Sequence, residues 1–118
     1  MKRTQRLRRP DQFQRARREG RSWDSPLLVL QAVANRRRAT RCGFVVSKRI
    51  GGAVERNRAK RRVREAVRLV YHVLPPGWDL VFVIRSPAVI TTAFPQLQDT
   101  IERLLRRASL WRAPPTIE

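Results

Sequence analysis

The sequence predicts a small two-layer α/β sandwich, in which helices cover a single sheet. Three runs rich in branched and aromatic residues have the length of buried strands, namely 27–33, 42–47 and 79–85. A long segment with helical periodicity, residues 53–74, separates the second run from the third, and shorter helical segments stand near both ends of the chain. Helices that alternate with strands in a chain of 118 residues are typical of one layered domain.

The predicted helices are delimited by residues that begin or end helical structure. Pro10 can occupy a first helical position and Gly20 is a plausible stop, which predicts a helix over residues 10–19. The run 75–77, Pro-Pro-Gly, ends the long helix sharply. Thr92 is expected to cap a last helix. The apolar positions of that helix recur at helical spacing and are Leu97, Ile101, Leu104, Leu105 and Ala108.

The chain shows no internal repeat and no linker, so we expect one domain over residues 1–118, with 109–118 as a loose tail. No apolar run is long enough to span a membrane, and the basic N-terminal stretch lacks the apolar core of a secretory signal, which predicts a cytoplasmic protein. The single cysteine, Cys42, is expected to be a small core residue. Trp78 opens a strand and is expected to pack, whereas Trp23 and Trp111 could pack or stack on bases.

Positive charge dominates the composition. The chain has 27 lysines and arginines against nine acidic residues, which gives a net charge of +18. A compact protein with that charge repels itself, so a polyanion is the expected partner. All but three of the basic residues are arginine, whose planar fork can bind two phosphate oxygens at once. Genomic base composition can also replace lysine with arginine, so the choice of arginine does not by itself decide the function.

The long helix has two distinct faces. Its apolar residues recur at steps of three and four and should pack on the sheet; they are Ala59, Val63, Ala66, Val67, Val70 and Leu74. The opposite face carries a polar stripe with the same spacing, made of Asn57, Arg61, Arg64 and Arg68. Further cations flank the stripe near the start of the helix, namely Arg56, Arg58, Lys60 and Arg62.

This charge pattern opposes helix formation. Cations four residues apart, such as Arg56 and Lys60, repel each other by roughly 0.2–0.5 kcal/mol in an isolated helix. Cations near a helix N-terminus also oppose the helix dipole. A solvated polar face is the simpler interpretation, but six cations within nine residues with few acids favour a polyanion-binding face. Lys48 and Arg49 precede a Gly-Gly break at 51–52, where free helix N–H groups could also meet an anion.

At these residues the sequence resembles the ribonuclease P protein family. The similarity centres on residues 46–65, which read VSKRIGGAVERNRAKRRVRE, with an Arg-Asn-Arg core at 56–58. It extends over about residues 3–112. Phe13 falls in the family's first helix, CGFVVS matches its third strand, and Ser86-Pro87-Ala88 and the last helix follow in order. Glycine stands at position 52, where the family usually has asparagine.

The resemblance implies a four-stranded sheet with three helices in the order αβββαβα, and a left-handed βαβ crossover around the long helix. It also implies that this helix faces the catalytic RNA of ribonuclease P. The residues expected to bind that RNA are Lys48, Arg49, Arg56, Asn57, Arg58, Lys60, Arg61, Arg64 and Arg68.

The resemblance further implies a cleft between the first helix and the sheet that holds the 5′ leader of precursor transfer RNA. Phe13 matches an aromatic residue of that cleft, although packing in the core is the alternative role. Arg17 stands where the family often has a second aromatic residue, and Gln31 replaces a frequent tyrosine on the facing strand. The cleft should therefore stack fewer bases and use more charge and hydrogen bonding, since each base stack contributes roughly 1–3 kcal/mol.

The residues themselves suggest no catalytic site in the protein. His72 is the only histidine, and the acidic residues are scattered rather than paired for acid–base or metal chemistry. The resemblance implies the same, because the RNA and its Mg²⁺ ions perform the endonucleolytic removal of the leader, and it implies no cofactor bound by the protein alone. The expected partners are the catalytic RNA and precursor transfer RNA, with no membrane and no small-molecule substrate. A structural ribosomal protein is the main alternative, and a true protein nuclease is the second.

Overall fold

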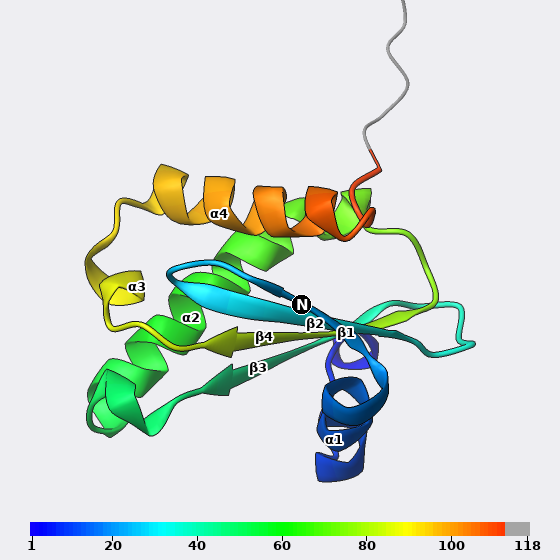
Figure 1. Cartoon of the computed structure of the whole chain (residues 1–118), viewed down its shortest axis with the longest axis horizontal. Helices are drawn as coiled ribbons and strands as arrows, with labels where there is room; N and C mark the ends of the chain where they lie inside the picture. The colour runs from blue at the N-terminus through cyan, green and yellow to red at the C-terminus, as the bar shows by residue number, and fades with distance from the viewer. Residues whose placement is uncertain (113–118) are drawn as a thin grey trace, which may run out of the picture.

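The computed structural model describes residues 1–112 and contains one sheet flanked by helices (Figure 1). The strands are β1 Arg21–Asp24, β2 Leu28–Ala34, β3 Arg41–Val46 and β4 Trp78–Ile84. The helices are α1 Pro10–Glu19, α2 Ala53–Val70, α3 Ala88–Thr91 and α4 Phe94–Arg107. There are also three short 3₁₀ turns. One precedes α1 (Arg3–Gln5), one precedes α2 (Lys48–Ile50) and one follows α2 (Tyr71–Val73).

The sheet has the strand order β1-β2-β4-β3. β1 pairs with β2 and β2 with β4 in antiparallel register, whereas β3 and β4 are parallel neighbours. Parallel neighbours require a crossover connection, and α2 provides it. The main elements therefore follow the expected order αβββαβα, and the left-handed sense of the crossover stays a prediction.

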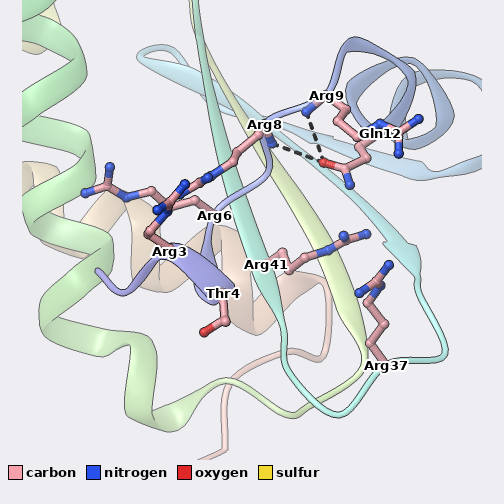
Figure 2. Close-up of a pocket in the computed structure, with 8 residues that line it drawn as sticks. All are labelled: Arg3, Thr4, Arg6, Arg8, Arg9, Gln12, Arg37 and Arg41. Carbon is pink, nitrogen blue, oxygen red and sulfur yellow. Dashed lines mark hydrogen bonds between the residues drawn. The ribbon is translucent and has the colours of Figure 1, made fainter.

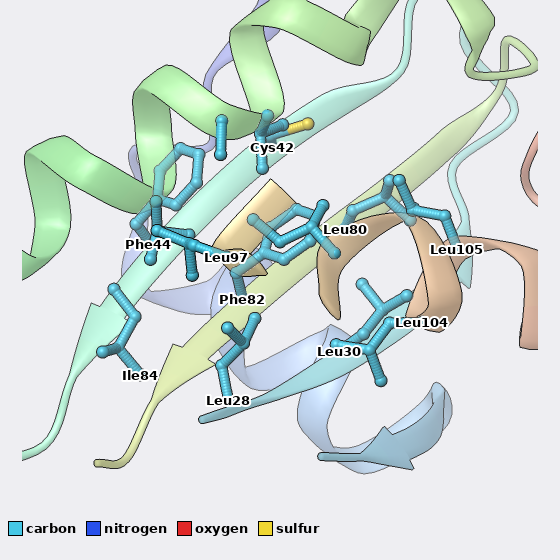
Figure 3. Close-up of a cluster of buried hydrophobic side chains, with 14 of the residues drawn as sticks. Leu28, Leu30, Cys42, Phe44, Leu80, Phe82, Ile84, Leu97, Leu104 and Leu105 are labelled. Atoms are coloured by element: carbon cyan, nitrogen blue, oxygen red, sulfur yellow. The ribbon is translucent and has the colours of Figure 1, made fainter. Parts of the chain in front are cut away.

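One face of the sheet packs against α2 and α4 and holds the main core (Figures 1 and 3). Alternate residues of each strand point to this face because the side-chain period of a strand is two. They pack against the apolar stripes of the two helices, and the interior is fully closed around Phe82 at 0% exposure. The largest buried contributors are Leu28, Leu30, Leu80, Phe82, Ile84, Val63, Val67, Leu97, Ile101, Leu104 and Leu105.

The other face of the sheet is only partly covered. Leu7 of the N-terminal segment and Ala16 of α1 pack there on Val33 and Val81 in a small second cluster. Figure 1 shows α1 on the side of the sheet opposite α4, near one end of the strands. Val45 of β3 lies on this face and keeps 39% of its surface exposed. An apolar floor beside α1 therefore remains accessible.

Reading the residues alone identified three of the four strands, and the resemblance implied the fourth. That strand is β1, with the sequence Arg-Ser-Trp-Asp. Three of its four residues are exposed, so it carries no apolar alternation that would mark a strand. Trp23 of β1 is partly buried against the main core, as are Trp78 and Trp111, and the guanidinium of Arg21 lies 5.5 Å from the Trp23 ring.

The expectation that Thr92 caps the last helix is wrong. Ala93 occupies the N-cap position of α4, and its side chain forms no capping hydrogen bond. The Thr92 hydroxyl instead donates to the Ala88 carbonyl at 2.6 Å and closes the four-residue helix α3, which was not expected. A threonine that follows one turn of helix can satisfy its free carbonyls, and that role competes with capping the next helix.

Residues 109–112 are not part of a loose tail, contrary to the expectation for 109–118. Leu110 is buried at 2% exposure, and the Arg112 N–H donates to the Val73 carbonyl at 2.8 Å. These contacts attach 109–112 to the core and to the turn that follows α2, whereas residues 113–118 lie outside the described residues. The long helix itself ends at Val70 and continues as the turn Tyr71–Val73, which shortens the predicted span 53–74.

Candidate nucleic-acid interface

The outer face of α2 carries the predicted polar stripe. Ala59, Val63, Ala66 and Val67 are buried on the opposite face, as the spacing predicts. Asn57, Arg61 and Arg68 are exposed, and the Nε of Arg61 donates to the Asn57 carbonyl at 3.4 Å. The remaining cations of the predicted set are exposed or half-buried on α2 or in the turn that precedes it, and they are Lys48, Arg49, Arg56, Arg58, Lys60 and Arg64.

The turn before α2 is held by its own residues. The Ser47 hydroxyl accepts a hydrogen bond from the Arg49 N–H at 3.2 Å, which caps the turn Lys48–Ile50. Gly51 then adopts a φ of 133°, a conformation that side chains disfavour, and Gly52 is the N-cap of α2 without a side-chain cap. The start of α2 therefore leaves backbone N–H groups beside Lys48 and Arg49, an arrangement that favours anions.

A pocket of about 320 Å³ lies between α2, β3 and the N-terminal segment, and we call it the α2 pocket. Four cations line it, namely Arg6, Arg8, Lys60 and Arg64. The Arg64 guanidinium lies 6.0 Å from the Phe44 ring, and burial together with the nearby Arg6 charge lowers the pKa of Arg64 from its usual value. The Nε atoms of Arg6 and Arg64 are buried without an acceptor among the described residues. Buried donors need acceptors, so the pocket is suited to an anion.

Two arginines of α2 are already engaged within the fold. Arg62 donates to the Thr92 carbonyl and lies 5.9 Å from the Phe94 ring, so it ties α2 to the start of α4. Arg68 forms an exposed ion pair with Glu65 at 2.6 Å. The hydrogen bond from Arg68 lowers the pKa of Glu65, and the same contact raises the pKa of Arg68. Arg68 is therefore the member of the predicted stripe whose charge is most compensated.

The three predicted cleft residues lie together. Phe13, Arg17 and Gln31 line one pocket of about 280 Å³, which we call the Phe13 cleft. Val45, Val81 and Val83 form its apolar floor. Phe13 and Gln31 are half-buried, and Arg17 is exposed. The cleft thus combines a partly exposed ring, an exposed cation and an amide around an apolar surface.

Phe13 also supports the fold. A Cβ added at Gly43 would approach the Phe13 ring to 2.4 Å, so the ring packs directly on the backbone of β3. One ring therefore forms part of the wall of both the α2 pocket and the Phe13 cleft. The alternative of a packing role for Phe13 is correct in part, and it does not exclude a ligand contact.

Several residues that line these pockets were not predicted from the sequence. Arg6 and Arg8 flank the buried Leu7 in an otherwise charged segment, and that isolated apolar residue was the available signal. Gly43 stands inside a strand, which often marks a close approach of another group. The cleft floor was encoded in the alternation of β4, whose odd-numbered valines point away from the main core.

Residues 1–112 offer little for protein-borne catalysis. His72 is exposed in the turn after α2, and the Ser47 hydroxyl is engaged as a cap. Cys42 is buried, and burial followed by the charge of Asp79 raises the pKa of its thiol. Within this range no three His, Cys, Asp or Glu side chains are grouped so that they could hold a metal ion. None of the helices described there is both long enough and apolar enough to cross a membrane.

Comparison with known proteins identifies the family to which the chain belongs. A family model described as Ribonuclease P matches residues 1–109. The chain belongs to the ribonuclease P protein family. The ribonuclease P protein component of Roseiflexus castenholzii is 62% identical over 110 residues, which cover 93% of this chain and 90% of that protein. That of Chloroflexus aurantiacus is 60% identical over 114 residues, covering 97% and 84% of the two chains.

Solved structures of ribonuclease P proteins have the same fold. The protein from Thermotoga maritima matches with a TM-score of 0.78 at 31% identity, over 86% of this chain and 96% of that chain. The protein from Staphylococcus aureus matches with a TM-score of 0.80 at 26% identity, over 92% and 98%. The chain is thus a subunit of the endoribonuclease ribonucleoprotein that matures the 5′ end of transfer RNA. The ribosomal alternative finds no support.

Proposed function

We propose that the chain acts as a single ribonuclease P protein domain that binds the catalytic RNA through α2 and the 5′ leader of precursor transfer RNA in the Phe13 cleft. The RNA subunit and its Mg²⁺ ions carry out the hydrolysis, and the protein positions both RNAs in the cytoplasm. One observation supports this assignment above the others. The Phe13 ring separates the α2 pocket from the Phe13 cleft, so the two predicted RNA sites are neighbours.

The α2 surface suits the catalytic RNA because its charge is largely uncompensated. Arg56, Arg58, Lys60 and Arg61 form no ion pair with any residue in 1–112. Cations that lack carboxylate partners can release counterions from RNA phosphates, which is the main source of affinity for a polyanion. Lys48, Arg49 and Asn57 extend the same surface toward the start of the helix.

The Phe13 cleft suits a single-stranded leader. The half-buried ring of Phe13 can stack on one base, and Arg17 can pair with a phosphate or lie flat on a second base. Arg17 follows Phe13 by four residues, so both side chains share one face of α1. Gln31 on β2 faces them across the pocket and can donate to or accept from a base edge.

The test compares a precursor with a long leader against one trimmed to about one leader nucleotide, which removes the stacking partner. Phe13→Ala and Arg17→Ala should each weaken binding of the long-leader precursor to the assembled holoenzyme by about 1–3 kcal/mol, the range for one lost stack. The trimmed precursor should bind nearly as before, because it does not reach the cleft.

Arg18→Ala is the matched control, because Arg18 is exposed on α1 and does not line the Phe13 cleft. It should leave the difference between the two precursors unchanged. Equal weakening of both precursors by Phe13→Ala and Arg17→Ala would show that these residues support the fold or the catalytic-RNA contact instead. Thermal unfolding of the free protein separates those two outcomes, and Arg17→Ala should shift it little because Arg17 is exposed.

A further inference from the structure

A third basic pocket lies between the N-terminal segment and the turn that joins β2 to β3, and we call it the N-terminal pocket (Figure 2). Its volume is about 340 Å³, and no acidic side chain lines it. It differs from the Phe13 cleft and from the outer face of α2. Six of its lining residues are arginines, namely Arg3, Arg6, Arg8, Arg9, Arg37 and Arg41.

Two of these arginines are already neutralised. Arg41 donates both Nε and a terminal nitrogen to the buried carboxylate of Asp79, at 2.9 and 2.8 Å. Arg9 lies 3.1 Å from Asp11 in an exposed pair. The other four, Arg3, Arg6, Arg8 and Arg37, form no ion pair within the part of the chain that the structure describes. Four uncompensated charges around one hollow are unfavourable unless an anion joins them.

The N-terminal wall of the pocket is fixed by the fold. Leu7 is buried, and its N–H donates to the Cys42 carbonyl at 2.9 Å, which fastens the segment to the edge of β3. The side-chain oxygen of Gln12 accepts from the N–H groups of Arg8 and Arg9 at 3.1 and 3.2 Å. Figure 2 shows this double contact, with the side chains of Arg3, Arg6 and Arg8 grouped on one side of the view and those of Arg37 and Arg41 on the other.

The opposite wall is held by a buried carboxylate. Asp79 binds Arg41 and also accepts from the Asn35 amide at 2.9 Å. Asn35 in turn accepts from the Arg37 N–H at 2.7 Å, which sets the turn that carries Arg37. Both walls therefore keep their backbone geometry without a ligand, and such preorganisation lowers the entropic cost of binding.

We propose that the N-terminal pocket is a further RNA site that binds phosphodiester groups, with Arg8 and Arg37 closing on the strand from the two walls. The planar fork of arginine fits phosphate oxygens, and the pocket supplies four such forks without a competing carboxylate. Arg6 and Arg8 line both this pocket and the α2 pocket, and Phe13 lines both the α2 pocket and the Phe13 cleft. The three hollows are therefore neighbours on the surface, which supports the passage of one RNA strand from one to the next.

The proposal rests on the proposed function, and the strand could come from either of two RNAs. The far end of the leader could pass the Phe13 cleft and reach the pocket, or a segment of the catalytic RNA could occupy it. Both sources supply the same phosphate chemistry, so the experiment separates them by the RNA used. Wild-type protein in each arm reports on the proposed function by itself.

The test variant is Arg8→Ala with Arg37→Ala. Neither side chain forms a hydrogen bond or an ion pair within residues 1–112, so the fold should persist, and thermal unfolding of the free protein checks this. The matched control is Arg36→Ala with Arg38→Ala, which removes the same amount of charge at two exposed residues that flank Arg37 and do not line the pocket.

The first arm measures binding of each protein to the catalytic RNA alone as a function of salt. The second measures binding of precursors with leaders of about two and about ten nucleotides to the assembled holoenzyme, since single-strand sites span a few to a dozen or so nucleotides. In the arm that supplies the strand, the test variant should lose about tenfold in affinity and about 1.4–1.8 in salt slope, the value for two phosphate contacts. The control should change by less than about twofold.

A loss in the first arm assigns the pocket to the catalytic RNA, and a loss confined to the longer leader assigns it to the leader. If the test variant loses no affinity in either arm while wild-type protein binds, RNA binding in the N-terminal pocket is contradicted and the proposed function is unaffected. An equal loss for the control variant also overturns it, because the effect then comes from general charge. Failure of wild-type protein to bind either RNA removes the proposed function itself.

Discussion

The helices α2 and α4 pack on the same face of the sheet but handle charge in opposite ways (Figure 1). On α4, Arg103 lies 3.0 Å from Asp99 and Arg106 lies 2.9 Å from Glu102, each one turn after its acid. On α2, seven cations stand beside two acids, and the helix forms one internal ion pair, at its C-terminal end. Each helix buries four apolar residues against the sheet, so the presence of a packed face does not explain the difference.

The two helices differ because one charge pattern stabilises a helix by itself, whereas the other leaves charge free to bind a partner. Acid-to-cation pairs at four-residue spacing stabilise a helix by itself, and α4 has them. The charge pattern of α2 lowers the stability of the free helix, because its cations repel one another and oppose the helix dipole. That unfavourable charge is tolerated because the α2 stripe packs well on the sheet. The surplus charge is then available for RNA.

The largest expected effect is a difference in RNA affinity between variants of α2 and variants of α4. Arg61→Ala with Arg64→Ala should lower affinity for the catalytic RNA roughly tenfold and reduce the log–log salt slope by about 1.4–1.8. The matched variant, Arg103→Ala with Arg106→Ala, removes the same charge from α4 and should leave both quantities nearly unchanged. Titration of the catalytic RNA at several salt concentrations measures both. Equal slopes for the two variants would mean that α2 is only a solvated face.

The second prediction concerns Arg62, the cation of α2 whose side chain contacts the start of α4. Arg62→Ala removes the hydrogen bond to the Thr92 carbonyl and the contact with the Phe94 ring. It should lower the free energy of unfolding by about 1.5 kcal/mol, the low end of the range for hydrogen bonds that involve a charged group, because Arg62 is only half-buried. Urea unfolding of the free protein measures this change.

Arg58 is the matched control for Arg62, because it is exposed on the same helix and makes no hydrogen bond or ion pair with residues 1–112. Arg58→Ala should leave unfolding nearly unchanged and weaken RNA binding, whereas Arg62→Ala should do the reverse. If both variants weaken RNA binding alike with the fold intact, the division of α2 into a structural and an RNA-binding side is wrong.

Helix periodicity made most of α2 predictable, because a surface stripe and a buried stripe both follow from spacing. Spacing could not distinguish Arg62 from the other cations of α2, because its partners, Thr92 and Phe94, are some thirty residues away in sequence. The same limit hid β1, whose pairing with β2 depends on backbone hydrogen bonds and whose residues show no apolar alternation. Long-range contacts of this kind leave no local signal.

The family motif allowed the residues of the Phe13 cleft to be predicted. Phe13, Arg17 and Gln31 do line one cleft, and binding of the leader there stays a prediction. The N-terminal pocket could not be predicted, because it depends on contacts between segments that are distant in sequence. The pocket forms only when Leu7 docks on β3 and Asp79 organises the turn at residues 35–40. A buried acid such as Asp79, at 1% exposure, reads in the sequence as an ordinary strand residue.

A third, smaller effect is expected on the stability of the two helices. Arg103→Ala should lower the free energy of unfolding by about 0.3–0.5 kcal/mol, the typical value of an exposed pair at four-residue spacing such as Arg103 with Asp99. Arg61→Ala should change it little or raise it by a similar amount, because removal of a cation relieves repulsion on α2. Added salt should shrink both differences, since it screens exposed charges. Unfolding in urea at low and high salt measures the signs, and matching signs would contradict the comparison.

The smallest expected effect lies just beyond α2, at His72. This residue is the only histidine of the chain and sits exposed in the turn Tyr71–Val73. A protein nuclease would need a general base, and histidine is the most frequent one, so His72 is the strongest candidate that the described residues offer. It stands past the C-terminal end of the basic face, and it lines neither the Phe13 cleft nor the α2 pocket. His72→Ala should therefore leave precursor processing by the reconstituted holoenzyme near the wild-type rate, measured under single-turnover conditions. A loss above about tenfold, which corresponds to roughly 1.4 kcal/mol in the barrier, would place part of the chemistry on the protein if the fold and RNA affinity are intact.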